Sequence, residues 1–261
     1  MKHRVNGRFW KTLSSAAPPA LAVALSACAS LPATVPTAQR SEIKRVGVVS
    51  LVENEMHAYF KVGPVLREKV GASIRETFLG PPVLGRWRVN HRLVTAASKA
   101  LGHRYRYVPL HYDPAKLARK AYKADPEHLK LGPIKHDLRR IGEGDVDTIV
   151  LVSTSGSLTR VVGRKVFLSG YGVYRQSILP GAPTVDYVAL RLMAIDVKTM
   201  QPVATRSAFV TRRLPTAMWN INVTSITPQQ RLALRKHVGN LLKRTVTDLV
   251  QDIGLGRTRP D

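Results

Sequence analysis

The chain has 261 residues and is strongly basic, with 41 Lys and Arg against 17 Asp and Glu and a net charge of +24. Its single cysteine excludes an internal disulfide and a zinc site built from paired thiolates. A hydrophobic content of 44% is ordinary for a globular protein, so we expect stability to come from a conventional core.

The first 27 residues have the layout of a secretory signal. Residues 1–11 carry four basic side chains and no acid, and residues 12–27 form an uncharged stretch rich in Ala, Leu and Val. This stretch is shorter than the roughly 20 apolar residues that a transmembrane helix needs. We therefore predict that residues 1–27 are a cleaved signal peptide, which leaves a chain with 37 basic and 17 acidic residues.

The signal ends in Leu25-Ser26-Ala27-Cys28, which contains the sole cysteine and resembles the lipobox of bacterial lipoproteins. The resemblance implies attachment of diacylglycerol to the Cys28 thiol, cleavage before Cys28 and acylation of the new amine. Ala29, rather than Asp, at the next position implies sorting to the outer membrane, on its periplasmic face. Three acyl chains exceed the two that a stable anchor needs. The alternative is an ordinary signal with a chance cysteine at its end.

Three segments are predicted after the signal. They are the lipidated Cys28 with a flexible tether over 28–42, a single α/β domain over 43–255 and a loose tail over 256–261. The tether is inferred from its prolines and small polar residues, which favour extended chain. The tail is inferred from Gly254 and Gly256, which end the last predicted helix.

Strand patterns open the domain. Residues 43–52 are apolar and β-branched, as in a buried strand, and residues 56–62 alternate apolar and polar side chains, as in a half-buried strand. Because only Glu53 to Glu55 separates these runs, we predict that they form a hairpin. Residues 65–78 have helical spacing of apolar side chains, although Gly71 weakens the pattern.

Helices dominate the next part of the chain. The predicted elements are a helix over 87–101, a strand over 103–110, a helix over 113–123 and a helix over 129–141. Asp113 followed by Pro114 is typical of an N-cap with proline at the first helical position. Gly132-Pro133 predicts a break in the last of these helices.

Strands return in the second half, before a final helix. Residues 147–153 predict a central strand, and residues 187–197 and 203–210 predict a long antiparallel hairpin. Thr227, Pro228 and Gln230 fit a capping box that opens a closing helix, which runs to about Ile253. The fold class is therefore α/β with α+β character: a single domain whose mixed, mostly antiparallel sheet is flanked by helices.

The first strand of this hairpin and the turn after it carry a further resemblance. Residues 189–199, which end in Asp196-Val197-Lys198-Thr199, are similar to a hairpin of periplasmic lipoprotein domains, such as the curli-secretion lipoprotein and the activators of penicillin-binding proteins. There, an Asp-x-Lys-Thr-Gly turn joins two strands, and this chain has Met200 in place of the glycine. The resemblance implies a turn capped by side-chain bonds to the backbone and no active residue.

Catalytic signatures are sparse. The chain has no Gly-x-Ser-x-Gly elbow and no Walker A pattern. Ser153, Ser155 and Ser157 follow the predicted central strand, where α/β proteins often bind ligands. A catalytic serine that is paired with a His distant in the sequence therefore stays open as an alternative. His103, His111 and Asp113 flank one predicted strand and are a conceivable metal corner, but this grouping is more typical of plain surface polarity. We predict neither a metal nor a cofactor.

The basic charge offers a second kind of site. Its densest runs are short, and they nominate six anion-binding candidates: Arg104, Arg106, Arg139, Arg140, Arg212 and Arg213. Arginine interleaved with aromatic residues can stack on bases, but alternation along a strand fits an amphipathic strand equally well. Nucleic acid is therefore not the favoured partner, and a solvated basic surface is the simpler interpretation.

Three functions remain in order of preference. The first is a noncatalytic, lipid-anchored periplasmic protein that binds or helps to assemble an envelope component, with envelope proteins, peptidoglycan or lipopolysaccharide as partners. The second is a lipid-anchored envelope hydrolase that uses a serine of the 153–157 loop. The third is a polyanion-binding protein, which requires Lys and Arg to gather on one face.

Overall fold

A computed structural model defines the fold over most of the chain. The residues described are 31–54, 56–60, 77–78, 87–123, 128–161, 163–175, 183–215 and 227–257. Residues 31–261 form one compact unit, and residues 1–30 a separate one. Because the predicted signal and Cys28 lie outside the described residues, cleavage and lipidation stay predictions.

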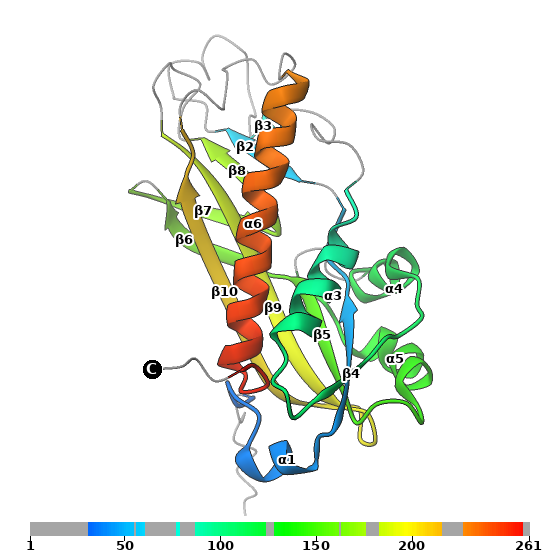
Figure 1. The fold of residues 1–261 in the computed structure, drawn as a ribbon. Coiled ribbons are helices and arrows are strands. Elements are labelled where there is room, and N and C mark those ends of the chain that lie inside the picture. Colours follow the sequence, from blue (N-terminus) through cyan, green and yellow to red (C-terminus); the bar gives the residue numbers. More distant parts are fainter. Residues whose placement is uncertain are drawn as a thin grey trace, which may run out of the picture. The chain divides into compact units, whose positions relative to one another are not determined.

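Figure 1 shows the helices and strands of the described residues in the compact unit. The helices are α1 (Thr37–Glu42), α3 (Val89–Ala100), α4 (Pro114–Ala121), the 3₁₀ turn η1 (Gly132–Ile134), α5 (Lys135–Gly142) and α6 (Pro228–Asp252). The first strands are β1 (Arg45–Ser50), β2 (His57–Phe60), β3 (Thr77–Phe78), β4 (Arg106–Val108) and β5 (Thr148–Thr154). The later strands are β6 (Gly156–Val161), β7 (Arg164–Ser169), β8 (Tyr171–Arg175), β9 (Thr184–Asp196) and β10 (Gln201–Arg213).

One mixed sheet organises these elements. Its strand order is β3-β2-β8-β9-β5-β1-β4, and β10 pairs with β9. β1 is parallel to β4 and β5, and β2 is parallel to β8, whereas β9 is antiparallel to β5, β8 and β10. The predicted α/β fold with a mixed, mostly antiparallel sheet, a long hairpin and a closing helix is confirmed.

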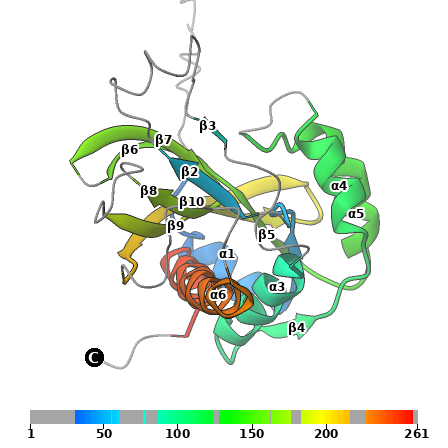
Figure 2. The ribbon, with the colours of Figure 1, turned by 90° about the horizontal axis from the view of Figure 1, so that it is seen from above.

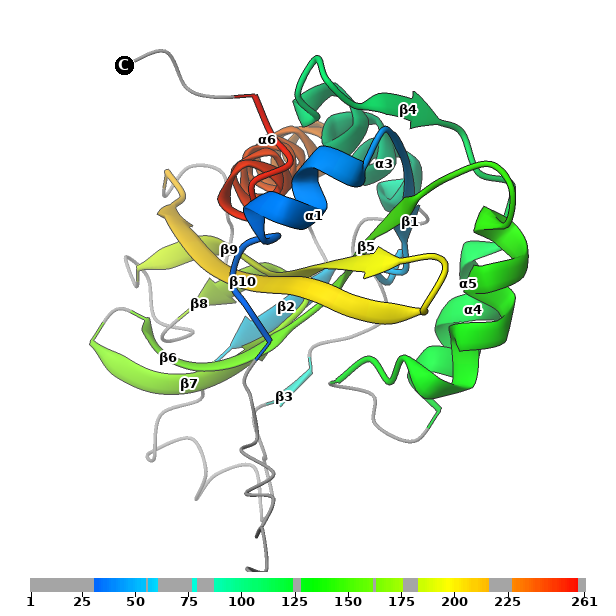
Figure 3. The same cartoon turned by 90° about the horizontal axis from the view of Figure 1, so that it is seen from below.

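The two faces of the sheet are set by alternation along the strands. Val46 and Val48 of β1 pack in the core that includes α3 and α6, whereas Val49 and Leu51 pack in a second core with α4 and α5. β5 divides its side chains in the same way, and all seven of its residues are buried. Figures 2 and 3 show α3 and α6 together on one side of the sheet, away from α4 and α5.

A hairpin leaves the sheet between β5 and β8. The chain departs at Ser155 as β6, returns as β7, and rejoins the sheet at Gly170, whose N–H donates to the Ser155 carbonyl at 3.3 Å. Ala189 of β9 bonds to both residues at this junction. The hairpin closes a third, small core, in which Val166 and Leu168 meet residues of β8 and β9.

The predicted hairpin between residues 43–52 and 56–62 is wrong. β1 pairs with β4 and β5, whereas β2 pairs with β8 and β3. β1 is buried on both faces. A strand buried in this way is stabilised by pairing along both of its edges, and both partners of β1 lie far away in the sequence. Of the predicted helix over 65–78, only Thr77–Phe78 is described, and it forms β3; the rest lies outside the described residues.

The predicted tether and tail both need correction where they are described. Residues 31–42 are largely exposed but are held to the domain: the Thr205 N–H donates to the Pro32 carbonyl at 3.0 Å, and Val35 is fully buried, with its N–H donating to the Ile253 carbonyl at 2.9 Å. At the other end, Gly256 forms a bridge with Leu101. The buried Val35 side chain and the carbonyl at the C-terminal end of α6 therefore hold this segment, although its composition favours extended chain.

Local capping signals are confirmed. The Asp113 Oδ1 atom accepts hydrogen bonds from the N–H groups of Ala115 and Lys116 at 2.9 and 3.1 Å, at the start of α4. Thr227 and Gln230 form the reciprocal capping box of α6, with the two hydrogen bonds at 3.2 and 2.9 Å.

Candidate functional site

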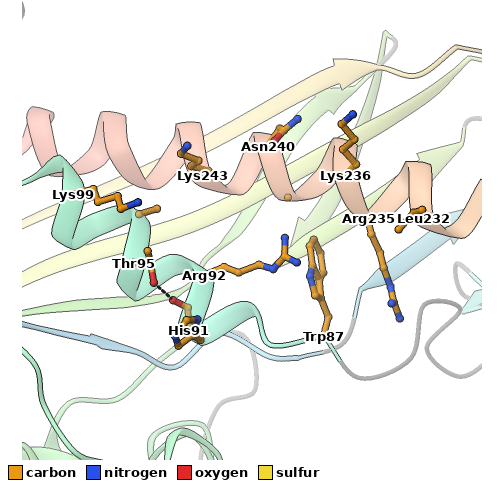
Figure 4. A pocket seen from close by; sticks show the side chains of 12 residues that line it. Trp87, His91, Arg92, Thr95, Lys99, Leu232, Arg235, Lys236, Asn240 and Lys243 are labelled. Atoms are coloured by element: carbon orange, nitrogen blue, oxygen red, sulfur yellow. Dashed lines mark hydrogen bonds between the residues drawn. The ribbon is translucent and has the colours of Figure 1, made fainter.

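A groove lies between α3 and α6 and is lined by residues of both helices and by Trp87 (Figure 4). It has a volume of about 680 Å³, within the range of ordinary ligand pockets. The two helices are far apart in the sequence, but α3 packs on β1 and α6 packs on β9, over the same face of the sheet. The topology therefore creates the groove.

Helical periodicity decides which side chains reach the groove. On α6, Leu232, Lys236, Gly239 and Lys243 recur every three or four residues and form one stripe, because such residues share a helix face. Leu234 and Val238 belong to the opposite stripe and are fully buried against the sheet.

The lining of α3 follows the same rule. Arg92, Ala96 and Lys99 lie four and three residues apart and border the groove, while Leu93 and Ala97 pack in the core. Each helix therefore turns an apolar face to the sheet and a largely cationic stripe to the groove.

Trp87, just before α3, forms part of the groove wall. Its side chain is only 6% exposed and meets the Tyr171 ring edge to face, with centroids 5.8 Å apart. The Arg92 guanidinium lies 5.5 Å from the centroid of the indole ring, in cation–π contact. Gly239 allows the close approach of α6, because a Cβ there would lie 3.1 Å from the indole.

The groove is positively charged, with five cations lining it: Arg92, Lys99, Arg235, Lys236 and Lys243. No acidic side chain lines it in the described part of the chain, and none of the five forms an ion pair with a described carboxylate. Other cations are paired, such as Arg45 with Asp147. Among the described residues, no acidic side chain therefore offsets the positive potential of the groove.

Hydrogen-bonding capacity in the groove is mainly that of donors. Lys and Arg side chains carry donors only, and the Thr95 hydroxyl already donates to the His91 carbonyl at 2.9 Å. The indole N–H of Trp87 is buried and has no hydrogen-bond partner within the described part of the chain. Such a lining favours a ligand rich in acceptor oxygens, such as a phosphate or carboxylate.

The six arginines nominated by the sequence do not converge on this groove. They are spread over β4 and the loop before it, α5 and β10, and several make local contacts. Arg212 is held by the fully buried Asp186, with Nη2 2.6 Å from Oδ2, and also donates to the His237 carbonyl. Arg104 donates to the Arg40 carbonyl, and Arg140 lies 3.9 Å from Asp137. The remaining three, Arg106, Arg139 and Arg213, are exposed on β4, α5 and β10.

The three nominated serines lie where β5 gives way to β6. Ser153 and Ser155 are buried, and their hydroxyls are 3.5 Å from the carbonyls of Arg191 and Gly156. Ser157 is half-buried on β6. No described histidine side chain is among the hydrogen-bond partners of these serines.

The group that does meet Ser153 is a phenol. The Tyr122 hydroxyl lies within hydrogen-bond distance of the Thr154 N–H, at 3.0 Å, and also contacts the Ser153 side chain. Burial raises the pKa of Tyr122, so this phenol stays protonated at neutral pH and is a poor general base.

Metal and membrane signatures are also missing from the described residues. His103 and His111 are exposed, and Asp113 is occupied as the N-cap of α4. No cluster of three His, Cys, Asp or Glu residues suited to a metal occurs among the described residues. Within the same residues, no helix is both long and apolar enough to cross a bilayer.

Sequence reasoning missed the groove residues because the cations of α3 and α6 are not adjacent in the sequence. The available signal was the spacing of Lys236, Gly239 and Lys243 on one face of the closing helix. That spacing could nominate a basic stripe, but it could not show that α3 supplies the opposite wall.

No protein-family model matches the chain, and no curated protein is similar to it in sequence. Several solved structures are similar to this chain at low sequence identity. PelC from Paraburkholderia phytofirmans, solved as a dodecamer, is 11% identical with a TM-score of 0.32, covering 87% of this chain and 94% of that one. Lipoprotein GNA1162 from Neisseria meningitidis is 13% identical with a TM-score of 0.28, covering 77% and 99%.

Another similar structure is the hypothetical protein CT253 from Chlamydia trachomatis. It is 9% identical with a TM-score of 0.32, covering 80% of this chain and 98% of that one. At TM-scores of this size, none of these similarities supports a functional conclusion.

Proposed function

We propose that this protein is a noncatalytic, lipid-anchored component of the bacterial cell envelope. Cys28 carries the lipid at the periplasmic face of the outer membrane, and the groove between α3 and α6 binds an anionic envelope component. The observation that supports the binding role is the set of five groove cations without a described acidic partner. Unpaired cations around a concave surface attract anions and raise their local concentration.

Binding is favoured over catalysis by the chemistry of the lining. The described groove residues include no carboxylate, cysteine or tyrosine, so His91 has no acidic partner there to orient it as a base. Ser153 and Ser155 are buried in the sheet and are not part of the groove lining. A hydrolase based on these serines therefore has no supporting arrangement among the described residues.

The binding role is tested with inorganic tripolyphosphate, a soluble anion without an apolar part. The chain from Ala29 onward, which includes the whole compact unit, is titrated by isothermal calorimetry. The triple variant Lys99→Ala, Lys236→Ala, Lys243→Ala removes exposed groove cations. If each contributes about 0.5 kcal/mol, affinity falls about tenfold.

A matched control removes the same charge elsewhere. Lys116→Ala, Arg139→Ala, Lys198→Ala changes three exposed cations outside the groove and should leave affinity within twofold. Equal weakening by both triple variants would mean that net charge alone attracts the anion, and the groove proposal would fail. The anchor is tested by labelling cells with radioactive palmitate, which Cys28→Ser should abolish.

A further inference from the structure

The groove also has an exposed leucine, an apolar side chain that the binding of a simple anion does not require. Leu232 of α6 is 69% exposed and borders the groove, together with Trp87 and Ala96. A single exposed leucine is ordinary on a protein surface and needs no explanation by itself. Leu232 is different because it stands one helical turn from Lys236, on the stripe of α6 that carries the groove cations.

This combination matches the interface of a bilayer. Helices that lie on membranes present apolar side chains to the acyl boundary and Lys or Arg to the headgroups. The long stems of Lys99, Lys236 and Lys243 can cover apolar surface while their ammonium groups stay in the polar layer. Phospholipid phosphates offer the acceptor oxygens that a donor-rich lining requires.

We propose that the groove docks on an anionic phospholipid surface. A lipid phosphate lies among the cations of α3 and α6, and Leu232 enters the acyl boundary. This inference rests on the proposed function, because it names the anionic component that the groove binds. Its consequence is a second attachment besides the lipid on Cys28, which fixes the side of the domain that faces the bilayer. Charge complementarity selects this occupant, since no described acid offsets the five cations.

Vesicle binding tests the inference directly. The chain from Ala29 onward, which lacks Cys28 and its lipid, is sedimented with vesicles of phosphatidylglycerol and phosphatidylcholine, or of phosphatidylcholine alone. We expect binding only to the anionic vesicles. The triple variant Lys99→Ala, Lys236→Ala, Lys243→Ala should lower the partition coefficient about 100-fold, since each cation near an anionic surface contributes several-fold.

Leu158 supplies a matched control for the apolar contact. It is also 69% exposed but lies on β6, outside the groove. Leu232→Ser should weaken vesicle binding at least about fourfold, which is the factor expected for each methylene group that is no longer buried. Leu158→Ser should leave it unchanged. Equal losses for both variants would mean nonspecific adsorption and would overturn the inference.

The tripolyphosphate titration separates this inference from the function on which it rests. If the wild-type chain binds tripolyphosphate in the groove but not the anionic vesicles, the membrane inference is wrong and the proposed anion binding stands. A soluble anion, such as a phosphorylated glycan or an acidic protein segment, would then be the occupant. If it binds neither probe, both proposals fail. If tripolyphosphate releases the chain from the anionic vesicles, the two ligands share the groove, as the inference requires.

Discussion

Met200 ends the turn between β9 and β10 with a backbone φ of +53°, a conformation that L-residues other than Gly, Asn and Asp seldom adopt. The turn is fastened by Asp196, whose Oδ1 atom accepts hydrogen bonds from the Thr199 N–H at 2.7 Å and from its hydroxyl at 3.0 Å. The Met200 side chain is fully buried in the core with α4 and α5. Packing therefore compensates for backbone strain of about 1 kcal/mol.

Substitution of Met200 can separate these two effects. Met200→Ala removes the packing but keeps the strain, and we expect a loss of about 2–4 kcal/mol in the free energy of unfolding. Met200→Gly removes both, so it should be no less stable than Met200→Ala, although glycine ordinarily costs up to about 1 kcal/mol more. Urea unfolding measures the difference. A glycine variant clearly less stable than the alanine variant would contradict the strain at this turn.

Contacts between residues close in the sequence are predictable from local patterns, whereas the partners of distant residues are not. The Asp196–Thr199 turn and the caps at Asp113 and Thr227 depend on neighbours within four residues, and each is confirmed. Arg212 was nominated for anions, but it faces Asp186 across the β9–β10 ladder. Strand register decides that pairing, and a composition pattern does not specify the register.

Helices α3 and α6 pack against each other beside the groove, and Gly239 lies at their contact with Trp87. Glycine inside a helix costs about 1 kcal/mol relative to alanine. A larger side chain would nevertheless be unfavourable here, because a Cβ at residue 239 would lie 3.1 Å from the indole ring, closer than ordinary van der Waals contact. Trp87 has little room to yield, since Tyr171 packs against its ring.

Gly239→Ala should therefore lower stability despite the better helix propensity. We expect a loss of about 1–2 kcal/mol, typical of overpacking, with a change in Trp87 fluorescence as the ring is displaced. Asn240→Ala changes the next, exposed residue and should stabilise α6 by a few tenths of a kcal/mol. Chemical denaturation of both variants is the measurement. A stabilised Gly239→Ala variant would show that the contact between the helices is loose.

The sequence predicts each of the two groove helices, but it does not predict that they pack against each other. The predicted ranges 87–101 and 228–253 lie close to α3, Val89–Ala100, and α6, Pro228–Asp252. Each range follows from the periodicity of its own apolar face. Their contact depends on the order of strands beneath them, which periodicity does not encode, so the candidate site became visible only in the fold.

The whole compact unit depends on parallel pairings between distant strands. β1 was predicted as a strand, but its neighbours were misassigned, because the sequence favours the nearest run as a hairpin partner. In the fold, Asp147 joins the starts of β1 and β5. Its Oδ2 atom accepts hydrogen bonds from the N–H groups of Lys44 and Arg45 at 3.0 and 2.8 Å, and Arg45 Nη2 lies 3.2 Å from Oδ1.

These contacts make Asp147 a source of acid sensitivity for the whole fold. Burial alone would raise the pKa of Asp147, but the backbone hydrogen bonds from Arg45 and Lys44, together with the hydrogen bond and charge of the Arg45 side chain, outweigh it, so the pKa lies below the ordinary 3.8. A depressed pKa in the folded state means that the ionised carboxylate stabilises the fold above pH 3.8. That contribution is lost as the pH falls through the folded-state pKa. The net charge of +24 also rises as the acids are neutralised, which adds repulsion.

Asp147→Asn should therefore lower the Tm at pH 7, and the deficit relative to the wild type should shrink as the pH falls below 3.8. Protonated Asp and Asn are both neutral, so neither retains the charge-assisted bonds that join β1 to β5. Asp145→Asn is the matched control, because its exposed side chain accepts no hydrogen bond from the described residues. Thermal unfolding followed by circular dichroism from pH 7 to pH 2.5 gives both curves. A deficit that stays constant with pH, or that Asp145→Asn reproduces, would assign the effect to net charge instead of to this carboxylate.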